Sequence, residues 1–182
     1  MVVNIIPKRE VNAQFFLNSR KIKVLNKKTG CQLDTTLLLE KDIKMKKILT
    51  FGVFDFFHLG HLRLFYQCKE KADYLIVAVQ NGDYINKFKP EAKILYSTDE
   101  RKEILGSLKI VDEVIVYDEV NINTLRKIDF DILALGEDHI GGRFDIVEEW
   151  CKQNGKEVVR LKRTPGITSS FIRSIVTRSD LR

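Results

Sequence analysis

Two histidines, His58 and His61, lie three positions apart directly after an apolar run of the chain. A helix that begins near His58 would place both imidazoles on one face. Gly60 between them leaves no side chain where a ligand would approach the backbone. The amino end of a helix that follows a strand already attracts phosphates, because its free N–H groups and positive dipole end point at anions. The spacing therefore indicates chemistry on a phosphate group.

A second segment, Arg163–Ser170 (RTPGITSS), combines a guanidinium, a glycine turn and four hydroxyl groups before an expected helix. A guanidinium offers a fork of donors suited to phosphate oxygens, and Thr168 and Ser169 can donate at the helix start. By itself the segment is explained equally well as a turn followed by a helix cap. Beside the histidine pair, a phosphate site becomes the favoured interpretation.

Five apolar segments from residue 48 onward are typical of strands, and the segments between them are typical of helices. The expected strands are 48–54, 73–80, 112–117, 130–135 and 157–161, and the expected helices are 59–71, 97–108, 124–128, 144–153 and 169–176. This order predicts an α/β fold, a Rossmann-like doubly wound parallel five-stranded sheet with helices on both faces. Ligands of such sheets collect at the carboxyl ends of the strands. The loops after the first, fourth and fifth strands should therefore line one site.

The positive charge of the chain is concentrated near its start. Residues 1–47 hold 11 Lys and Arg against 4 Asp and Glu, whereas the remainder holds 20 against 21. A nucleic-acid-binding protein would carry its basic residues on the folded body, so no nucleic-acid partner is expected. We predict two parts. Residues 1–44 form a basic N-terminal extension of unknown role, which is interpreted as an arm, a hairpin or the result of a misassigned start codon. Residues 45–182 form a catalytic domain.

Composition narrows the class of protein further. The chain is 44% apolar and 31% charged, which is typical of a globular protein. No run approaches the roughly 20 apolar residues of a membrane span, and the N-terminus lacks the apolar region of a signal peptide. Three cysteines without a CxxC spacing favour neither a disulfide framework nor a zinc site, and a zinc site from both histidines and His139 is disfavoured. A cytoplasmic location is expected.

The two motifs, GVFDFFHLGH at 52–61 and RTPGITSS at 163–170, resemble those of the HxGH nucleotidyltransferases. The likeness is strongest to the cytidylyltransferases, which join CTP to an alcohol phosphate, and it extends through DYLIVAV at 73–79 and VDEV at 111–114. It implies transfer of CMP from CTP to a small phosphorylated alcohol, with glycerol 3-phosphate favoured, and release of pyrophosphate. Two alternatives stay open: an adenylyltransferase of the same fold acting on FMN or a sugar phosphate, and a nucleotide-binding protein without catalysis.

The resemblance also implies roles for individual residues. The expected catalytic residues are His58, His61, Lys89 and Arg163. The expected nucleotide-binding residues are Gly52, Val53, Phe54, Asp55, Gly60, Gly136, Glu137, Arg163, Thr164, Gly166, Ile167, Thr168 and Ser169. The expected acceptor-binding residues are Lys87, Lys89, Arg101, Lys109 and Asp112. For Arg101 the alternative is an ordinary ion pair on an exposed helix face.

The remaining expectations concern the metal and the assembly. Nucleoside triphosphates are used as their metal complexes, so Mg²⁺ is expected to enter with CTP and to have no direct protein ligand. The expected partners are CTP, a phosphorylated alcohol and a second copy of the chain in a homodimer.

Overall fold

The computed structural model describes residues 13–18, 21–26, 32–33 and 45–179. The chain forms two compact units, Met1–Lys44 and Met45–Arg182. In the first unit, β1 (Ala13–Asn18), β2 (Lys21–Asn26) and β3 (Gln32–Leu33) pair in antiparallel order. The extension therefore contains a hairpin, one of the interpretations left open by the sequence.

The second unit is built on a parallel five-stranded sheet of order β6-β5-β4-β7-β8. Its strands are β4 (Lys47–Gly52), β5 (Tyr74–Gln80), β6 (Glu113–Tyr117), β7 (Ile132–Gly136) and β8 (Glu157–Leu161). Its helices are α2 (Leu59–Lys69), α3 (Gly82–Phe88), α4 (Thr98–Gly106), α5 (Ile122–Leu125), α6 (Arg143–Gln153) and α7 (Ser169–Ser179).

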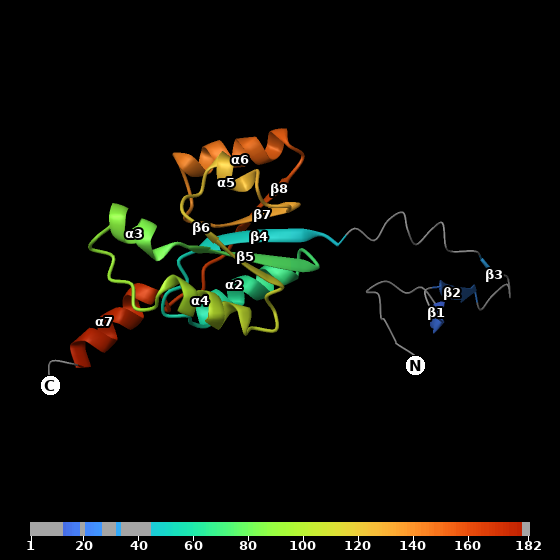
Figure 1. The fold of residues 1–182 in the computed structure, drawn as a ribbon, viewed down its shortest axis with the longest axis horizontal. Helices are drawn as coiled ribbons and strands as arrows, with labels where there is room; N and C mark the ends of the chain where they lie inside the picture. Colours follow the sequence, from blue (N-terminus) through green and yellow to red (C-terminus); the bar gives the residue numbers. More distant parts are fainter. Residues whose placement is uncertain (1–12, 19–20, 27–31, 34–44, 180–182) are drawn as a thin grey trace. The chain divides into compact units, whose positions relative to one another are not determined.

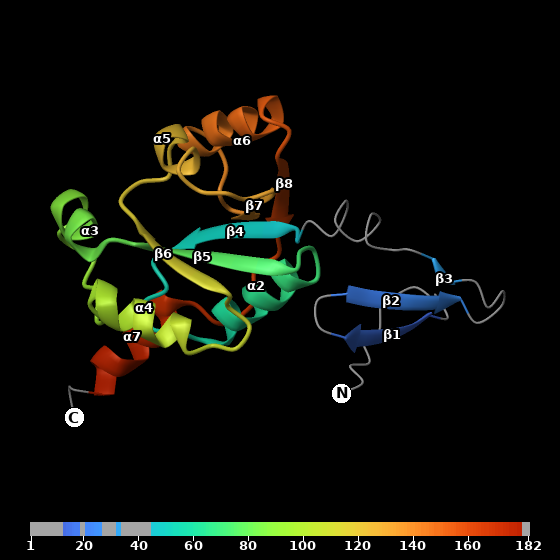
Figure 2. The same cartoon turned by 45° about the vertical axis from the view of Figure 1, so that its right-hand side comes forward.

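Helices cover both faces of this sheet. The inner strands are buried on both sides, so they are apolar almost throughout. On one face Leu75 and Val77 pack with Phe65 of α2 and with residues of α4. On the other face Ile76 packs with Val147 of α6 and with α5. Figures 1 and 2 show α2 and α4 on one side of the sheet and α5 and α6 on the other. The predicted α/β fold is confirmed.

The strand order determines where a ligand can bind. The chain runs outward from β4 through β5 to β6 and then returns to place β7 on the other side of β4. The connections after β4 and β7 therefore diverge and leave a crevice at the carboxyl ends of these two strands. The predicted carboxyl-edge loops thus meet between β4 and β7.

The differences from the expected elements have local causes. Helix α3 was not predicted, because Asn81-Gly82-Asp83 has the composition of a turn; in the structure the Asn81 side chain accepts a hydrogen bond from the Asp83 N–H and caps the helix. The predicted capping box is confirmed, since Ser97 and Glu100 bond each other's backbone at the start of α4. None of the helices that the structure describes has the length and apolar character needed to span a bilayer.

Candidate active site

A pocket of about 340 Å³ lies at the carboxyl ends of β4 and β7, within the range of small-molecule sites. Its walls come from the ends of the two strands, the start of α2, and the segment that leads from β8 into α7. The lining residues are Thr50, Phe51, Gly52, Val53, Phe54, His58, Gly60, His61, Leu64, Gly136, Asp138, His139, Leu161, Lys162, Arg163, Thr164, Ile167, Thr168, Ser169 and Ser170. Both sequence motifs thus contribute to one cavity.

The loop between β4 and α2 is strained. Phe54 and Phe56 both adopt positive φ angles, 55° and 49°, which bulky residues rarely do and which cost on the order of 1–3 kcal/mol each. The Phe54 ring folds back over Gly52, where a Cβ would lie 2.7 Å from the ring. Glycine at position 52 is therefore required, and the loop turns sharply enough to bring His58 to the start of α2.

His58 is the N-cap of α2. Its Nδ1 accepts a hydrogen bond of 3.0 Å from the Gly60 N–H, which satisfies one free donor of the helix end. Burial lowers the pKa of His58 below its ordinary value, so the ring is neutral at pH 7 and carries its proton on Nε2. A Cβ at Gly60 would lie 2.8 Å from the His58 ring. Gly60 therefore makes this ring position accessible.

His61 lies one turn into the helix and stacks on His58. The ring centroids are 3.9 Å apart and the planes differ by 18°. The rings of Phe54 and Phe57 enclose His61 further. Burial, with a smaller repulsion from His58, lowers the pKa of His61 to about 3. Among the described residues its buried Nδ1 has no hydrogen-bond partner. The pocket therefore presents two neutral imidazoles.

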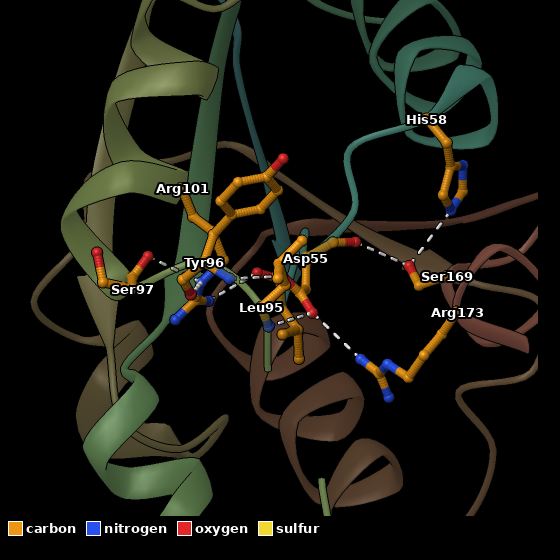
Figure 3. Close-up of polar contacts among 9 residues, drawn as sticks. Asp55, His58, Leu95, Tyr96, Ser97, Arg101, Ser169 and Arg173 are labelled. Carbon is orange, nitrogen blue, oxygen red and sulfur yellow. Dashed lines mark hydrogen bonds and ion pairs between the residues drawn. The ribbon is translucent and has the colours of Figure 1, made fainter. Parts of the chain in front are cut away.

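The amino end of α7 contacts this histidine pair through Ser169. The Ser169 Oγ donates to the backbone carbonyl of Asp55 at 2.9 Å and lies 3.4 Å from the Nε2 of His58. Since Nε2 of His58 carries the proton, it is the donor to Ser169. The first turns of α2 and α7 thus converge on one point (Figure 3). Two helix amino ends that face one cavity favour a polyanionic ligand.

Asp55 lies behind this wall and does not line the pocket. Its carboxylate is 3% exposed and accepts bonds from the backbone N–H groups of Leu95 and Tyr96, at 3.0 and 3.1 Å. Arg173 of α7 donates to the same carboxylate at 3.1 Å. The structure therefore makes Asp55 a bridge between three segments (Figure 3). It does not line the pocket, and the nucleotide contact that its place in the motif indicated stays a prediction.

Arg101 is fully buried in the same region. Its guanidinium donates to the carbonyls of Val53 (2.7 Å), Gln80 (2.8 Å) and Tyr96 (3.1 Å), as well as to that of Ser97. These bonds hold the ends of β4 and β5 against α4. The sequence allowed two interpretations of Arg101, acceptor binding and an exposed ion pair, and neither describes this arrangement. Its charge and its position on the helix do not reveal that four carbonyls converge there.

At the β7 end of the pocket, a guanidinium pairs with a carboxylate. The guanidinium of Arg163 makes two hydrogen bonds to the Asp138 carboxylate, the Nε–Oδ1 bond measuring 2.8 Å. The Arg163 N–H donates to the Glu137 side chain at 3.1 Å. His139 accepts a bond from the Gly136 N–H and stacks on Phe144. Asp138 and His139 line the pocket where Glu137 was expected.

Most of the predicted catalytic and nucleotide-binding residues are brought together. Of these, Gly52, Val53, Phe54, His58, Gly60, His61, Gly136, Arg163, Thr164, Ile167, Thr168 and Ser169 line the pocket, whereas Asp55, Lys89, Glu137 and Gly166 do not. The pocket also contains residues to which the sequence assigned no site role, among them Asp138, His139 and Lys162. These three lie one or two positions from a predicted residue, so extending the motifs that far would have found them.

The predicted acceptor residues do not line this pocket. Lys87 and Lys89 are exposed at the end of α3, on the carboxyl edge of the sheet. Asp112 lies at the amino edge, because its carboxylate accepts from the N–H of Leu75 near the start of β5 and from Lys69. Lys109 is exposed in the same connection between α4 and β6. The Asp112 carboxylate ties strand starts together and does not line the pocket, and its acceptor contact stays a prediction.

The described residues contain no group of three or more His, Cys, Asp or Glu side chains that could hold a metal ion. The pocket instead offers imidazoles, hydroxyls, a guanidinium and backbone N–H groups. This donor set fits phosphate oxygens.

Comparison with known proteins supports this description. Residues 49–175 match the family model "Cytidylyltransferase-like". The chain is 37% identical over 131 residues to a glycerol-3-phosphate cytidylyltransferase of Bacillus spizizenii, covering 71% of this chain and 95% of the relative. It is also 37% identical over 125 residues to an FAD synthase of Ferroglobus placidus, covering 65% and 77%. A solved lipopolysaccharide core biosynthesis protein from Thermoplasma volcanium shares the fold, with a TM-score of 0.54 at 23% identity over 66% of this chain and 97% of that one. The chain therefore belongs to the cytidylyltransferase-like family, and the protein is a nucleotidyltransferase.

Proposed function

We propose that the protein transfers CMP from MgCTP to a small phosphorylated alcohol, with glycerol 3-phosphate the favoured acceptor. The products are a CDP-alcohol and pyrophosphate. The observation that carries the proposal is the convergence of the His58 and His61 rings with the RTPGITSS segment on one pocket. The likeness to glycerol-3-phosphate cytidylyltransferases over 95% of the length of one such relative supports the choice of nucleotide and acceptor.

The triphosphate binds at the paired amino ends of α2 and α7. Free N–H groups of both helices, the Thr168 hydroxyl, the N–H of His61 and the Nε2–H of His58, which its long 3.4 Å contact with Ser169 leaves partly available, supply donors there. The nucleoside extends toward Gly136 and His139 at the end of β7, in the crevice beside β4. This direction follows the general placement of nucleotides in doubly wound sheets.

The reaction is an in-line displacement at the α-phosphorus. A phosphate oxygen of the acceptor forms the new bond to that phosphorus, while the bond from the α-phosphorus to the bridging oxygen breaks and pyrophosphate leaves with the electron pair. A dianionic phosphate needs no general base, so the two neutral histidines act as hydrogen-bond donors. They stabilise charge that develops on the phosphoryl oxygens, in positions fixed before the substrate arrives.

Arg163, a proposed phosphate contact, is held in place before the substrate binds. Its guanidinium is already held by Asp138, so it is oriented before CTP binds, which reduces the ordering cost of binding. Lys87 and Lys89 remain predicted acceptor or phosphate contacts, and both stand exposed at the carboxyl edge. Magnesium enters as part of the nucleotide complex, held by phosphate oxygens.

An assay matrix tests the proposal. The full chain is incubated with CTP or ATP in Mg²⁺ buffer, each with glycerol 3-phosphate, FMN or a sugar 1-phosphate, and pyrophosphate release is measured with the product identified by ³¹P NMR. We expect turnover with CTP and a phosphorylated alcohol. Turnover with ATP and FMN alone would replace the proposal by the FAD synthase activity named for one relative. Binding of CTP without turnover by any pair would indicate a nucleotide-binding protein that lacks catalysis.

The homodimer is a further prediction that follows from the family resemblance, and the cytoplasmic location is one that follows from the composition. Light scattering of the purified full chain measures the first, and a mass twice that of the 21.1 kDa chain is expected.

A further inference from the structure

The pair formed by Asp55 and Arg173 has no direct part in the pocket, since neither residue lines it. Yet Asp55 lies inside the strained loop between Phe54 and Phe56, and Arg173 lies on the helix that supplies Ser169. The pair therefore joins the loop that leads to His58 to the helix that leads to Ser169 (Figure 3).

Helix α7 touches Asp55 at two points. Ser169 and Arg173 are four positions apart, so they lie on the same helix face, one turn apart. Ser169 donates to the Asp55 backbone carbonyl and Arg173 donates to its carboxylate. A single contact would leave α7 free to rotate about that point. Two contacts one turn apart define both its rotation and its position along the axis.

The second contact also has an electrostatic cause. The Asp55 carboxylate is 3% exposed, and a buried carboxylate needs compensation by donors or a cation. Leu95 and Tyr96 supply N–H groups, Arg173 supplies a positive charge in direct contact, and the charge of Arg101 also acts on Asp55. The Arg173 guanidinium in addition lies 5.4 Å from the centre of the Phe56 ring, a cation–π distance. It thus covers one of the two residues held at positive φ.

We propose that Arg173 is a positioning residue of the transfer reaction, which acts through Asp55 to hold Ser169 of α7 against the Nε2–H of His58. The inference rests on the proposed function for its kinetic part only. Loss of the pair lets α7 shift relative to α2, and the two helix ends then no longer meet the triphosphate in one geometry. Misplacement by about 1 Å costs on the order of 10²-fold in rate.

The kinetic test compares Arg173→Gln with Arg173→Lys, which keeps the charge, and with Arg126→Gln, which removes a charge from an exposed residue at the end of α5. We expect Arg173→Gln to lower kcat by about 10²-fold with a smaller change in KM for CTP. Arg173→Lys should recover much of the loss, and Arg126→Gln should behave as wild type. Wild-type kcat in Arg173→Gln overturns the proposal.

A second readout needs no substrate. The chain has three histidines, so ¹⁵N–¹H spectra of the imidazoles in the ligand-free protein contain three rings. Arg173→Gln should shift the Nε2 signal of His58 and leave His139, bonded to Gly136 at the other end of the pocket, unchanged. An unmoved His58 signal overturns the proposal. Because the spectra do not depend on turnover, they test the positioning role of the Asp55–Arg173 pair even where the assay matrix rejects CTP as substrate.

A double-mutant cycle tests whether Arg173 acts through Asp55. Asp55→Asn keeps the shape and one acceptor oxygen but removes the charge. Coupled residues give non-additive effects, so we expect Arg173→Gln to add little to the His58 shift, and to the kcat loss, of Asp55→Asn. Additive effects in both measurements overturn the coupling. Where Asp55→Asn fails to fold, the comparison of Arg173→Gln with Arg173→Lys still tests the proposal.

Discussion

The rings of His58 and His61 stack with their centroids 3.9 Å apart. Two imidazolium ions at that distance would repel each other, and both rings are partly or largely removed from water, so the pair is neutral in the free enzyme. The spacing of three residues on one helix face therefore has an electrostatic consequence as well as a geometric one. Burial lowers the pKa of both rings, repulsion from His58 lowers that of His61 further, and each neutral ring keeps one N–H as a donor.

Stability should fall as the pH falls below 6.5. The pKa of His61 is about 3 in the folded chain and about 6.5 in the unfolded chain, so the unfolded state binds more protons between these values. The free energy of unfolding then drops by at most about 1.4 kcal/mol per pH unit for this group. His58 and His139, whose pKa values are also lowered by burial, act in the same direction.

Urea unfolding at pH 7.5, 6.0 and 5.0 measures this dependence. His61→Asn should flatten the slope across that window, whereas Lys152→Gln, at an exposed residue of α6, should not. Equal slopes in His61→Asn and wild type would contradict the neutral state assigned to His61.

The helix-capping role of His58 can be separated from its proposed catalytic role. His58→Ala removes the acceptor for the Gly60 N–H and should cost roughly 0.5–2 kcal/mol of stability, together with about 10²–10³-fold in kcat. His58→Asn restores a side-chain acceptor for the cap but not the imidazole. It should therefore recover stability, measured by thermal unfolding, without recovering kcat. Recovery of kcat by Asn would mean that His58 matters only as a cap.

A methyl group at Gly60 should disturb the histidine pair. A Cβ there would lie 2.8 Å from the His58 ring, so Gly60→Ala should displace the ring and lower kcat at least about tenfold, in line with the sensitivity of rate to misplacement. Gly106→Ala is the matched control, because a Cβ at this last residue of α4 meets nothing within 4 Å. It should raise stability by about 0.4–1 kcal/mol and leave kcat unchanged. Equal kcat in both variants would contradict the assigned ring position.

Arg101 should be essential for stability rather than for acceptor binding. Arg101→Lys retains the charge but cannot reach all four carbonyls, and each buried acceptor left unpaired costs about 1–3 kcal/mol. We expect a loss of about 3 kcal/mol or more in urea unfolding, with KM for the acceptor unchanged below the unfolding transition. A raised KM without a loss of stability would instead support the acceptor role that the sequence predicted.

The sequence identified the elements whose signals are local. The apolar runs at 73–80 and 130–135 appear as β5 and β7, since strands buried on both faces must be apolar almost throughout. The capping box at Ser97 and Glu100 likewise depends on residues three positions apart. Helix α3 was not predicted, because its amino end has the composition of a turn. Its stability derives from the Asn81 cap and from burial of Ile85.

The sequence alone indicated the nucleotidyltransferase class, because the motifs around His58, His61 and RTPGITSS are recognised by residue type and short spacing. Only the tertiary structure decided how the charged residues are used. Asp55 and Arg101 look like ligand contacts along the chain, but each is buried among partners from distant segments. Asp138 was overlooked, and it pairs with Arg163 across 25 positions. A carboxylate or guanidinium carries the same charge in either role, and only burial and the convergence of distant segments determine whether its partner is a ligand or the fold.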